Sequence, residues 1–140
     1  MRLLLLTMIA QFACSFPAAA SESVKGEAEI RDAVTIVIDG ARYTLADIVE
    51  PQEKTCGNRP CGEAAIQLIG PRLAGRQTTC LKERRLGHGR FLARCKLEDG
   101  TDLATVILEE GLALPESNAP PGYISAAQKA KLEGRGVWSH

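Results

Sequence analysis

The chain has 140 residues, enough for one domain and short for two. Its acidic and basic residues balance to a formal net charge of zero, which argues against a protein that binds nucleic acid through an overall basic charge. A local basic cluster does occur, and we interpret it as the solvated side of a hairpin: Lys82, Arg84, Arg85, Arg90, Arg94 and Lys96.

The first 20 residues have the pattern of a secretory signal peptide. Arg2 supplies a positive charge, an apolar run extends from Leu3 to Phe12, and small residues predict cleavage after Ala20. The apolar run is too short for a transmembrane helix. We therefore expect a periplasmic or secreted protein that is not held in a membrane after cleavage, with a flexible arm over residues 21–29 and a folded domain over 30–140.

A β-hairpin is predicted directly after this arm. Residues 34–38 are β-branched throughout, which is typical of a strand. Asp39-Gly40 suits the left-handed φ values of a tight turn. Residues 42–48 then alternate, with Tyr43 and Leu45 on one face and polar side chains on the other.

The rest of the chain predicts a helix, two strands and two more helices. The first helix covers 61–73, with Ala65, Leu68 and Ile69 at helical spacing, and Thr101 is the expected cap of the second. Because strands and helices form separate blocks, an α+β domain or a barrel with helices is favoured over a parallel sheet. The remaining expected elements are strands at 77–81 and 90–97, a helix that ends at Gly111, and a last helix at 123–133.

Four cysteines follow the signal segment: Cys56, Cys61, Cys80 and Cys95. An even number in an exported chain favours two disulfides. Four thiolates also suit zinc, but the spacing lacks the paired short knuckles of a zinc ribbon. Three pairings are open, and we predict Cys56–Cys61 and Cys80–Cys95, since neighbouring strands would bring the second pair together.

Several motifs, in order, resemble the staphylococcal-nuclease-like (thermonuclease-like) family in its exported, cysteine-bearing form. These are Cys56…Cys61-Gly-Glu-Ala-Ala65, Gly89-Arg-Phe-Leu-Ala-Arg-Cys95, Gly100-Thr-Asp-Leu103…Gly111-Leu-Ala113 and Tyr123…Gly136-Val-Trp138. The resemblance covers roughly residues 30–138. It implies a five-stranded OB-type barrel with three helices.

The resemblance also shows where the chain departs from an active nuclease. Such members hold Ca²⁺ with two aspartates, use a glutamate beside the attacking water, and place two arginines on the phosphate. At the corresponding positions this chain has Val34 and Val49 for the aspartates, Gln52 for the glutamate and Thr44 for one arginine. The other arginine is Arg90, preceded by His88 where the family often has an aromatic residue.

These replacements favour a non-catalytic binding or structural module, a pseudoenzyme without a cofactor. Its expected partner is a protein or, weakly, a nucleic acid, and the expected state is a monomer. The alternative is an active Ca²⁺-dependent nuclease that hydrolyses DNA or RNA through a relocated acidic site. That site would use Asp32, Asp47 or Glu50 with Arg90.

Overall fold

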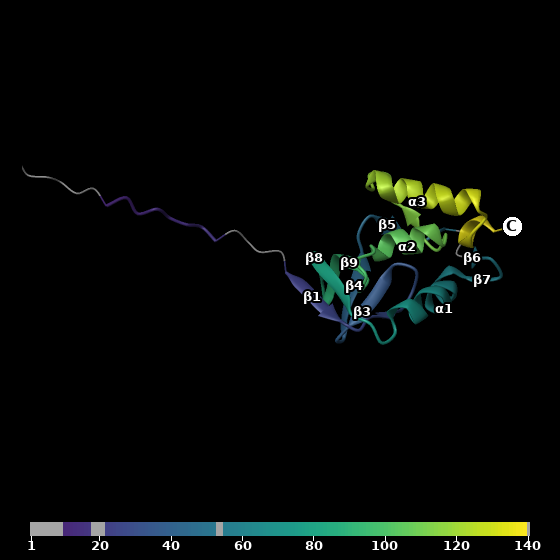
Figure 1. Ribbon diagram of the computed structural model, residues 1–140, viewed down its shortest axis with the longest axis horizontal. Coiled ribbons are helices and arrows are strands. Elements are labelled where there is room, and N and C mark those ends of the chain that lie inside the picture. Colours follow the sequence, from purple (N-terminus) through teal and green to yellow (C-terminus); the bar gives the residue numbers. More distant parts are fainter. Residues whose placement is uncertain (1–9, 18–21, 53–54, 140) are drawn as a thin grey trace, which may run out of the picture.

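The computed structural model describes residues 10–17, 22–52 and 55–139. Most of the predicted signal peptide and its cleavage position therefore lie outside the described residues. The described part of that segment, residues 10–17, is exposed and without regular secondary structure, and it extends away from the folded body (Figure 1). No helix in the described part of the chain is long and apolar enough to cross a membrane.

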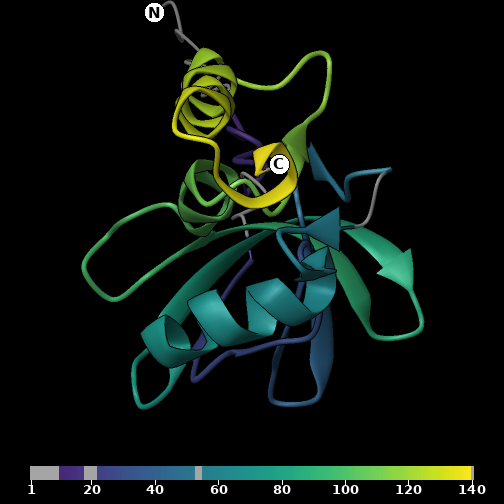
Figure 2. The same ribbon diagram turned by 90° about the vertical axis from the view of Figure 1, so that its right-hand side faces the viewer.

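The centre of the fold is a curled six-stranded sheet (Figure 2). Only the β4–β9 pair is parallel, and the other neighbours are antiparallel. The strands at the two ends of the sheet, β1 and β2, follow each other in the chain and are separated by two residues. Together they correspond to one bent strand of the expected five-stranded barrel. In spatial order the strands are β1 (Ser23–Gly26), β8 (Thr78–Gly87), β9 (Arg90–Lys96), β4 (Ala41–Leu45), β3 (Thr35–Ile38) and β2 (Glu29–Ile30).

The expectation of a flexible arm over residues 21–29 is wrong where the structure describes that segment. Strand β1 pairs with β8 in the register Val24 to Cys80, and the backbone N–H of Lys82 donates to the carbonyl of Glu22. The segment is polar, so its pattern indicates no buried strand. Its order comes from backbone hydrogen bonds to a partner that is distant in the sequence.

The β3–β4 hairpin confirms the alternation predicted from the sequence. Asp39 and Gly40 both have positive φ, 48° and 80°, at the tight turn between the strands. Tyr43 and Leu45 are buried in the core, whereas Arg42 is exposed on the opposite face. The outer face of this hairpin is therefore polar and accessible.

Three α-helices and one 3₁₀ turn complete the main elements: α1 (Cys61–Leu73), α2 (Leu103–Glu109), α3 (Pro121–Leu132) and η1 (Gly136–Trp138). Figures 1 and 2 show α1 against the curled sheet and α3 stacked on α2, and α2 also contacts β9. Two short sheets join the loops, β5 (Ile48–Val49) with β10 (Leu114–Pro115) and β6 (Thr55–Cys56) with β7 (Arg59–Pro60).

Two local predictions about the helices are corrected. Leu68 is 48% exposed, because the buried stripe of α1 passes instead through Ala64, Ala65, Ile69 and Leu73. The cap of α2 is Asp102 rather than Thr101, since the Asp102 carboxylate accepts a hydrogen bond from the backbone N–H of Thr105 at 2.9 Å.

Both predicted disulfides are present in the structure. Cys80 and Cys95 are directly opposed on β8 and β9, and both are almost fully buried. Cys56 and Cys61 connect β6 to the start of α1. Two disulfides fit a protein of an oxidising compartment, such as the periplasm or the cell exterior.

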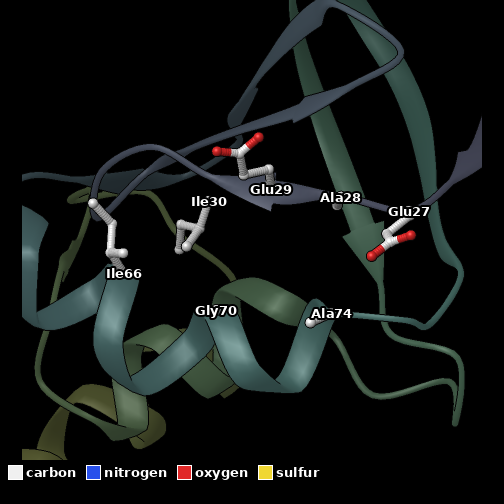
Figure 3. Close-up of a pocket in the computed structure, with 7 residues that line it drawn as sticks. All are labelled: Glu27, Ala28, Glu29, Ile30, Ile66, Gly70 and Ala74. Atoms are coloured by element: carbon white, nitrogen blue, oxygen red, sulfur yellow. The ribbon is translucent and has the colours of Figure 1, made fainter.

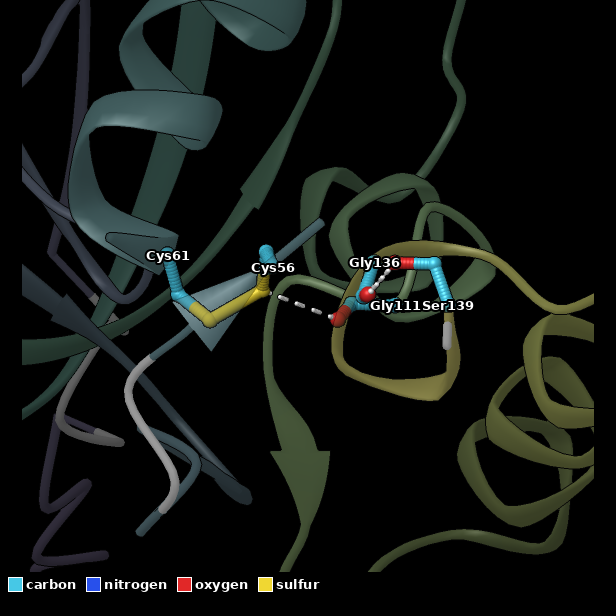
Figure 4. The surroundings of a disulfide bond; sticks show 5 residues. All are labelled: Cys56, Cys61, Gly111, Gly136 and Ser139. Carbon is cyan, nitrogen blue, oxygen red and sulfur yellow. Dashed lines mark hydrogen bonds between the residues drawn. A yellow bond between two sulfur atoms is a disulfide. The ribbon is translucent and has the colours of Figure 1, made fainter. Parts of the chain in front are cut away.

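The end of the chain packs closely against the C-terminus of α2 (Figure 4). The carbonyl of Gly111 accepts a hydrogen bond from the N–H of Val137 at 2.9 Å, and Sγ of Cys56 lies 3.5 Å from the same carbonyl. The carbonyl of Gly136 accepts from the N–H of Gly57 at 3.2 Å. Three distant segments are thus joined at this point.

Candidate anion-binding site

A hollow of about 710 Å³ lies over the outer face of strands β3, β4 and β9. It contains three positively charged side chains and one negatively charged side chain. Its polar lining consists of Arg31, Asp32, Thr35, Arg42, Thr44 and Arg90. The hollow is therefore basic, although the whole chain carries no net charge.

The sheet register explains why two arginines meet here. Strands β4 and β9 run parallel with Arg42 directly beside Arg90, and neighbouring strands lie only about 4.8 Å apart. Like charges at directly opposed positions are destabilising. Within the described residues neither guanidinium takes part in an ion pair, so an anion from solution would relieve the repulsion between them.

The two threonines lie on the same face as these arginines. Thr44 follows Arg42 by two residues on β4 and is paired with Thr35 on β3. Both are half-buried. A hydroxyl group both donates and accepts hydrogen bonds, so the floor of the hollow can contact neutral polar groups as well as charged ones.

The three carboxylates considered as candidates for a relocated metal site lie in different places. Asp32 lines the hollow, and its Oδ1 accepts a hydrogen bond from the N–H of Val34 at 2.9 Å. Asp47 is paired with Arg94, and Glu50 lines another depression beside Pro51 and Cys61. Across residues 10–17, 22–52 and 55–139, no group of three or more His, Cys, Asp or Glu side chains is arranged to hold a metal ion.

The two positions that the resemblance assigns to the metal-binding aspartates of active nucleases carry valines in this chain. Val34 is half-buried against the core, and Val49 is 41% exposed on β5. Ca²⁺ requires oxygen ligands, several of them anionic, and a valine side chain has none. Gln52 is exposed and neutral. The hollow therefore holds three arginines and one carboxylate, that of Asp32.

Arg94 joins the turn before β5 to the sheet. Its guanidinium donates to the carboxylates of Asp47 and Glu83. Burial alone would lower the pKa of Arg94, but these hydrogen bonds and the two negative charges outweigh it and raise the pKa. Asp47 has a positive φ of 64°, so this pair also holds a turn that few residues adopt readily.

Tyr123 of α3 provides a prediction about pH. Burial, together with the negative charge of Asp102, raises the pKa of Tyr123 to about 12. Because the folded state favours the neutral phenol, this contribution to stability is complete below about pH 10, the unfolded pKa. It is lost as the pH rises toward 12.

We expect the urea midpoint of the protein to fall between pH 10 and 12 more steeply than that of Tyr123→Phe, which has no ionisable phenol. Comparing the two proteins cancels the effect of other groups that titrate in the same range. A constant difference between their midpoints over this range would contradict the prediction.

His88 occupies the exposed turn between β8 and β9 with a φ of 49°. It is not among the residues that line the hollow. Its position suits a tight turn. Its side chain forms no hydrogen bond with another described residue.

Comparison with known proteins agrees with this fold and geometry. A family model described as staphylococcal nuclease homologue matches residues 42–140. The chain belongs to this family. The match includes Thr44, Val49, Gln52 and Arg90, and it begins after Asp32 and Val34.

The chain is also similar to "Succinoglycan biosynthesis protein ExoI" of Rhizobium meliloti (strain 1021). The two are 32% identical over 139 residues, which covers 94% of this chain and 73% of that protein.

Sequence reasoning identified Arg90 and missed Arg42. The resemblance assigns the second phosphate arginine to the position of Thr44, and Arg42 stands two residues earlier on the same strand face. The alternating pattern of β4 did place Arg42 on the outer face. Its importance arises only from the parallel pairing with β9, which no local pattern indicates.

Proposed function

We propose that this protein is a non-catalytic member of its family that binds an anionic ligand in the hollow around Arg42 and Arg90. The observation that carries the proposal is the direct opposition of these two arginines without a carboxylate partner among the described residues. Guanidinium groups bind phosphate and carboxylate through paired, charge-assisted hydrogen bonds. Two of them on adjacent strands suit one doubly charged group or two neighbouring singly charged groups.

The same residues support binding without hydrolysis. Cleavage of a phosphodiester by this family's chemistry requires a cation to neutralise developing charge and a base to activate water. Val34 and Val49 supply no oxygen to a cation, and the amide of Gln52 accepts no proton at neutral pH. An anion needs only the arginines, which remain.

The similarity to the Rhizobium meliloti protein supports a role outside nucleic-acid breakdown. That protein is named for succinoglycan biosynthesis. We extend to this chain, as part of the proposal, a role connected with succinoglycan biosynthesis. We also place the protein in the periplasm or outside the cell, because the two disulfides fit an oxidising compartment.

A nuclease assay and an anion titration test the proposal together. The purified protein is incubated with single- and double-stranded DNA and RNA in Ca²⁺, Mg²⁺, Mn²⁺ or EDTA, and we expect no metal-dependent cleavage. Phosphate should raise the melting temperature at constant ionic strength, since a ligand at about ten times its Kd adds about 1.4 kcal/mol of stability. Chloride serves as the control anion.

Arg42→Gln and Arg90→Gln should each abolish most of the phosphate-induced shift. The matched control is Arg76→Gln, which changes an exposed arginine near Glu98 and Asp99 beyond the far end of β9. Metal-dependent cleavage, or a phosphate shift that survives both substitutions, would end the proposal.

One observation favours the alternative of an active nuclease. Asp32 lines the same hollow as Arg90, so one carboxylate shares this space with the arginine that the resemblance assigns to the phosphate. This alternative requires that Ca²⁺ raise the melting temperature and that Asp32→Asn remove both the shift and the cleavage.

A further inference from the structure

We infer that the groove between β2 and α1 is a docking site for an extended basic segment of a partner protein, which adds a strand to the free edge of β2. This inference goes beyond the proposed anion-binding function and concerns a different surface. Three observations carry it: backbone groups of β2 that have no partner, an open floor on α1, and two carboxylates on β2 and the residues before it.

The groove has a volume of about 460 Å³ and is bounded by a strand on one side and a helix on the other. Figure 3 shows β2 crossing above α1, with the side chain of Ile30 directed into the space between them. Ile66 of α1 is 47% exposed and lines the same space. The full lining consists of Glu27, Ala28, Glu29, Ile30, Ile66, Gly70 and Ala74.

One edge of β2 is free. This strand stands at the end of the six-stranded sheet and pairs only with β3. The N–H of Arg31 donates to the carbonyl of Thr35 on the β3 side, and the carbonyl of Ile30 belongs to the same planar trans peptide, so it points the opposite way. By the alternation of an antiparallel ladder, the N–H of Ile30 and the carbonyl of Ala28 also point away from β3.

These outward backbone groups have no partner among the described residues. No backbone hydrogen bond outside the β2–β3 ladder involves them, and neither does any side-chain hydrogen bond. Ala28 and Ile30 are each only 4% exposed, and unpaired backbone groups are costly where water has little access. A strand added at a free sheet edge supplies such partners.

Gly70 keeps the floor of the groove open. It lies inside α1, where a glycine costs about 1 kcal/mol relative to alanine. An added Cβ at this position would meet nothing within 4 Å, so packing within the described residues does not require a glycine. Glycine permits another backbone to approach closely, and an added strand beside β2 would make such an approach.

The charges of the groove favour a basic partner. Glu27 and Glu29 are both exposed, and no basic side chain is among the described residues that line the groove. Glu27 accepts a hydrogen bond from the N–H of Gly75 at 2.8 Å, and Glu29 pairs with Arg31 at 3.3 Å. Because exposed ion pairs contribute little, both carboxylates remain available to a lysine or arginine of the partner.

The same charges disfavour two other occupants. A second copy of this chain, paired edge to edge through β2, would bring like carboxylates together across the new ladder, which is destabilising. The described N-terminal segment, residues 10–17, has no charged side chain and extends away from the folded body.

The side chains of the partner segment should alternate. Successive side chains of a strand point to opposite faces, so those on one face would lie toward Gly70 and those on the other toward Glu29. Small apolar residues suit the first face and lysine or arginine the second. The expected partner segment therefore alternates basic and small apolar residues.

The test measures binding of a fluorescently labelled peptide, Lys-Val-Lys-Ala-Lys-Val with blocked ends, to the purified protein by anisotropy. The control is the neutral peptide Ser-Val-Ser-Ala-Ser-Val. We expect the basic peptide to bind at least about tenfold more tightly than the neutral one, with an affinity that falls as salt rises because salt screens exposed charges. Equal affinities, or no binding of the basic peptide, would overturn the inference.

N-methylated forms of the basic peptide test the backbone pairing. Methyl groups on alternate residues block the hydrogen-bonding groups of one edge of an extended peptide, so two such forms block opposite edges. We expect one form to bind like the parent peptide and the other to lose binding, because only one edge meets β2. Equal affinities of the two forms would overturn strand addition.

Gly70→Leu is the sharpest variant, because the leucine side chain fills the groove without meeting the rest of the protein. It should abolish peptide binding, and its urea midpoint should equal or exceed that of the native protein, since leucine is the better helix former. The matched control is Gly122→Leu in α3, where an added Cβ also meets nothing within 4 Å; it should bind the peptide normally. Full binding by Gly70→Leu would overturn the groove as the site.

Removing the two carboxylates tests the charge selection. Glu27→Gln combined with Glu29→Gln should weaken binding of the basic peptide about tenfold and flatten its salt dependence, as expected when charge-assisted contacts are lost. An amide oxygen at position 27 can still accept from Gly75, so the local fold is preserved. Glu98→Gln, at an exposed glutamate outside the groove, should change neither quantity. Unchanged binding in the double variant would overturn the choice of a basic partner.

Amide hydrogen exchange places the peptide on β2 and separates this inference from the proposed function. Exchange of the Ile30 N–H should slow when the peptide is saturating, because that group gains an acceptor, and unchanged exchange would overturn the inference. The phosphate-induced thermal shift should be the same in Gly70→Leu as in the native protein, since Gly70 does not line the arginine hollow. Loss of one binding activity therefore leaves the other measurable.

Discussion

Replacing Gly111 or Gly136 with alanine should cost roughly 3 to 5 kcal/mol of stability, which is enough to unfold a marginal domain. Both glycines have positive φ, 69° and 56°. A Cβ at Gly111 would overlap the carbonyl of Arg135 and lie 2.8 Å from its carbonyl carbon, and a Cβ at Gly136 would overlap the carbonyl of Gly111. The obstacle in each case is backbone, so no side-chain movement relieves it.

Two other glycines separate the two sources of this cost. Gly75 has a φ of 71° and nothing within 4 Å of an added Cβ, so Gly75→Ala should lose only about 1 kcal/mol from backbone strain. Gly122 has ordinary φ and open space within α3, so Gly122→Ala should be neutral or slightly stabilising. Urea denaturation of all four variants provides the comparison. Equal losses in Gly111→Ala and Gly75→Ala would mean that the close backbone approach contributes nothing.

Removing the Cys80–Cys95 disulfide should have the second largest effect. This bridge closes a loop with a sequence separation of 15, and in the chain-entropy model a loop of that size contributes about 3 kcal/mol. Cys80→Ala combined with Cys95→Ala should lower the guanidinium midpoint accordingly, measured without reductant. The β8–β9 hairpin has many backbone hydrogen bonds of its own, so the variant should still fold to the same secondary structure.

The second bridge is a matched control for this experiment. Cys56–Cys61 has a sequence separation of only 5, for which the same model gives about 2 kcal/mol. Reductant added to the native protein should reproduce the sum of both losses. An unchanged guanidinium midpoint after loss of Cys80 and Cys95 would contradict the prediction. It would mean that residual hairpin structure restricts the unfolded chain as much as the bridge does.

The elements that sequence reasoning predicted well are those specified by local patterns. The alternation around Tyr43 and Leu45, the Asp39-Gly40 turn and the range of α1 all follow from side-chain periodicity and turn chemistry, and the structure confirms them. The errors involve contacts between distant segments. Strand β1 is polar and is ordered only by its pairing with β8, and Leu68 has helical spacing but faces solvent.

In the candidate site, too, some residues can be found from local motifs and others only from contacts between distant segments. Arg90 and the replaced positions Val34, Val49 and Gln52 are found by aligning motifs along the chain. Arg42 is found only when the parallel register of β4 and β9 is known. Asp47 looks available in the sequence and is instead paired with Arg94. Charged residues predict chemistry poorly until their nearest neighbours in space are known.

The pairing of β1 with β8 also has a consequence for how the protein is made. Residues 23–26 leave the ribosome long before their partners at 78–81, so the barrel stays unclosed until more than half of the polypeptide has been synthesised. Late closure of this kind raises contact order and slows folding. A chain that completes its core late remains extended for longer, which is compatible with passage through a narrow translocation channel before folding.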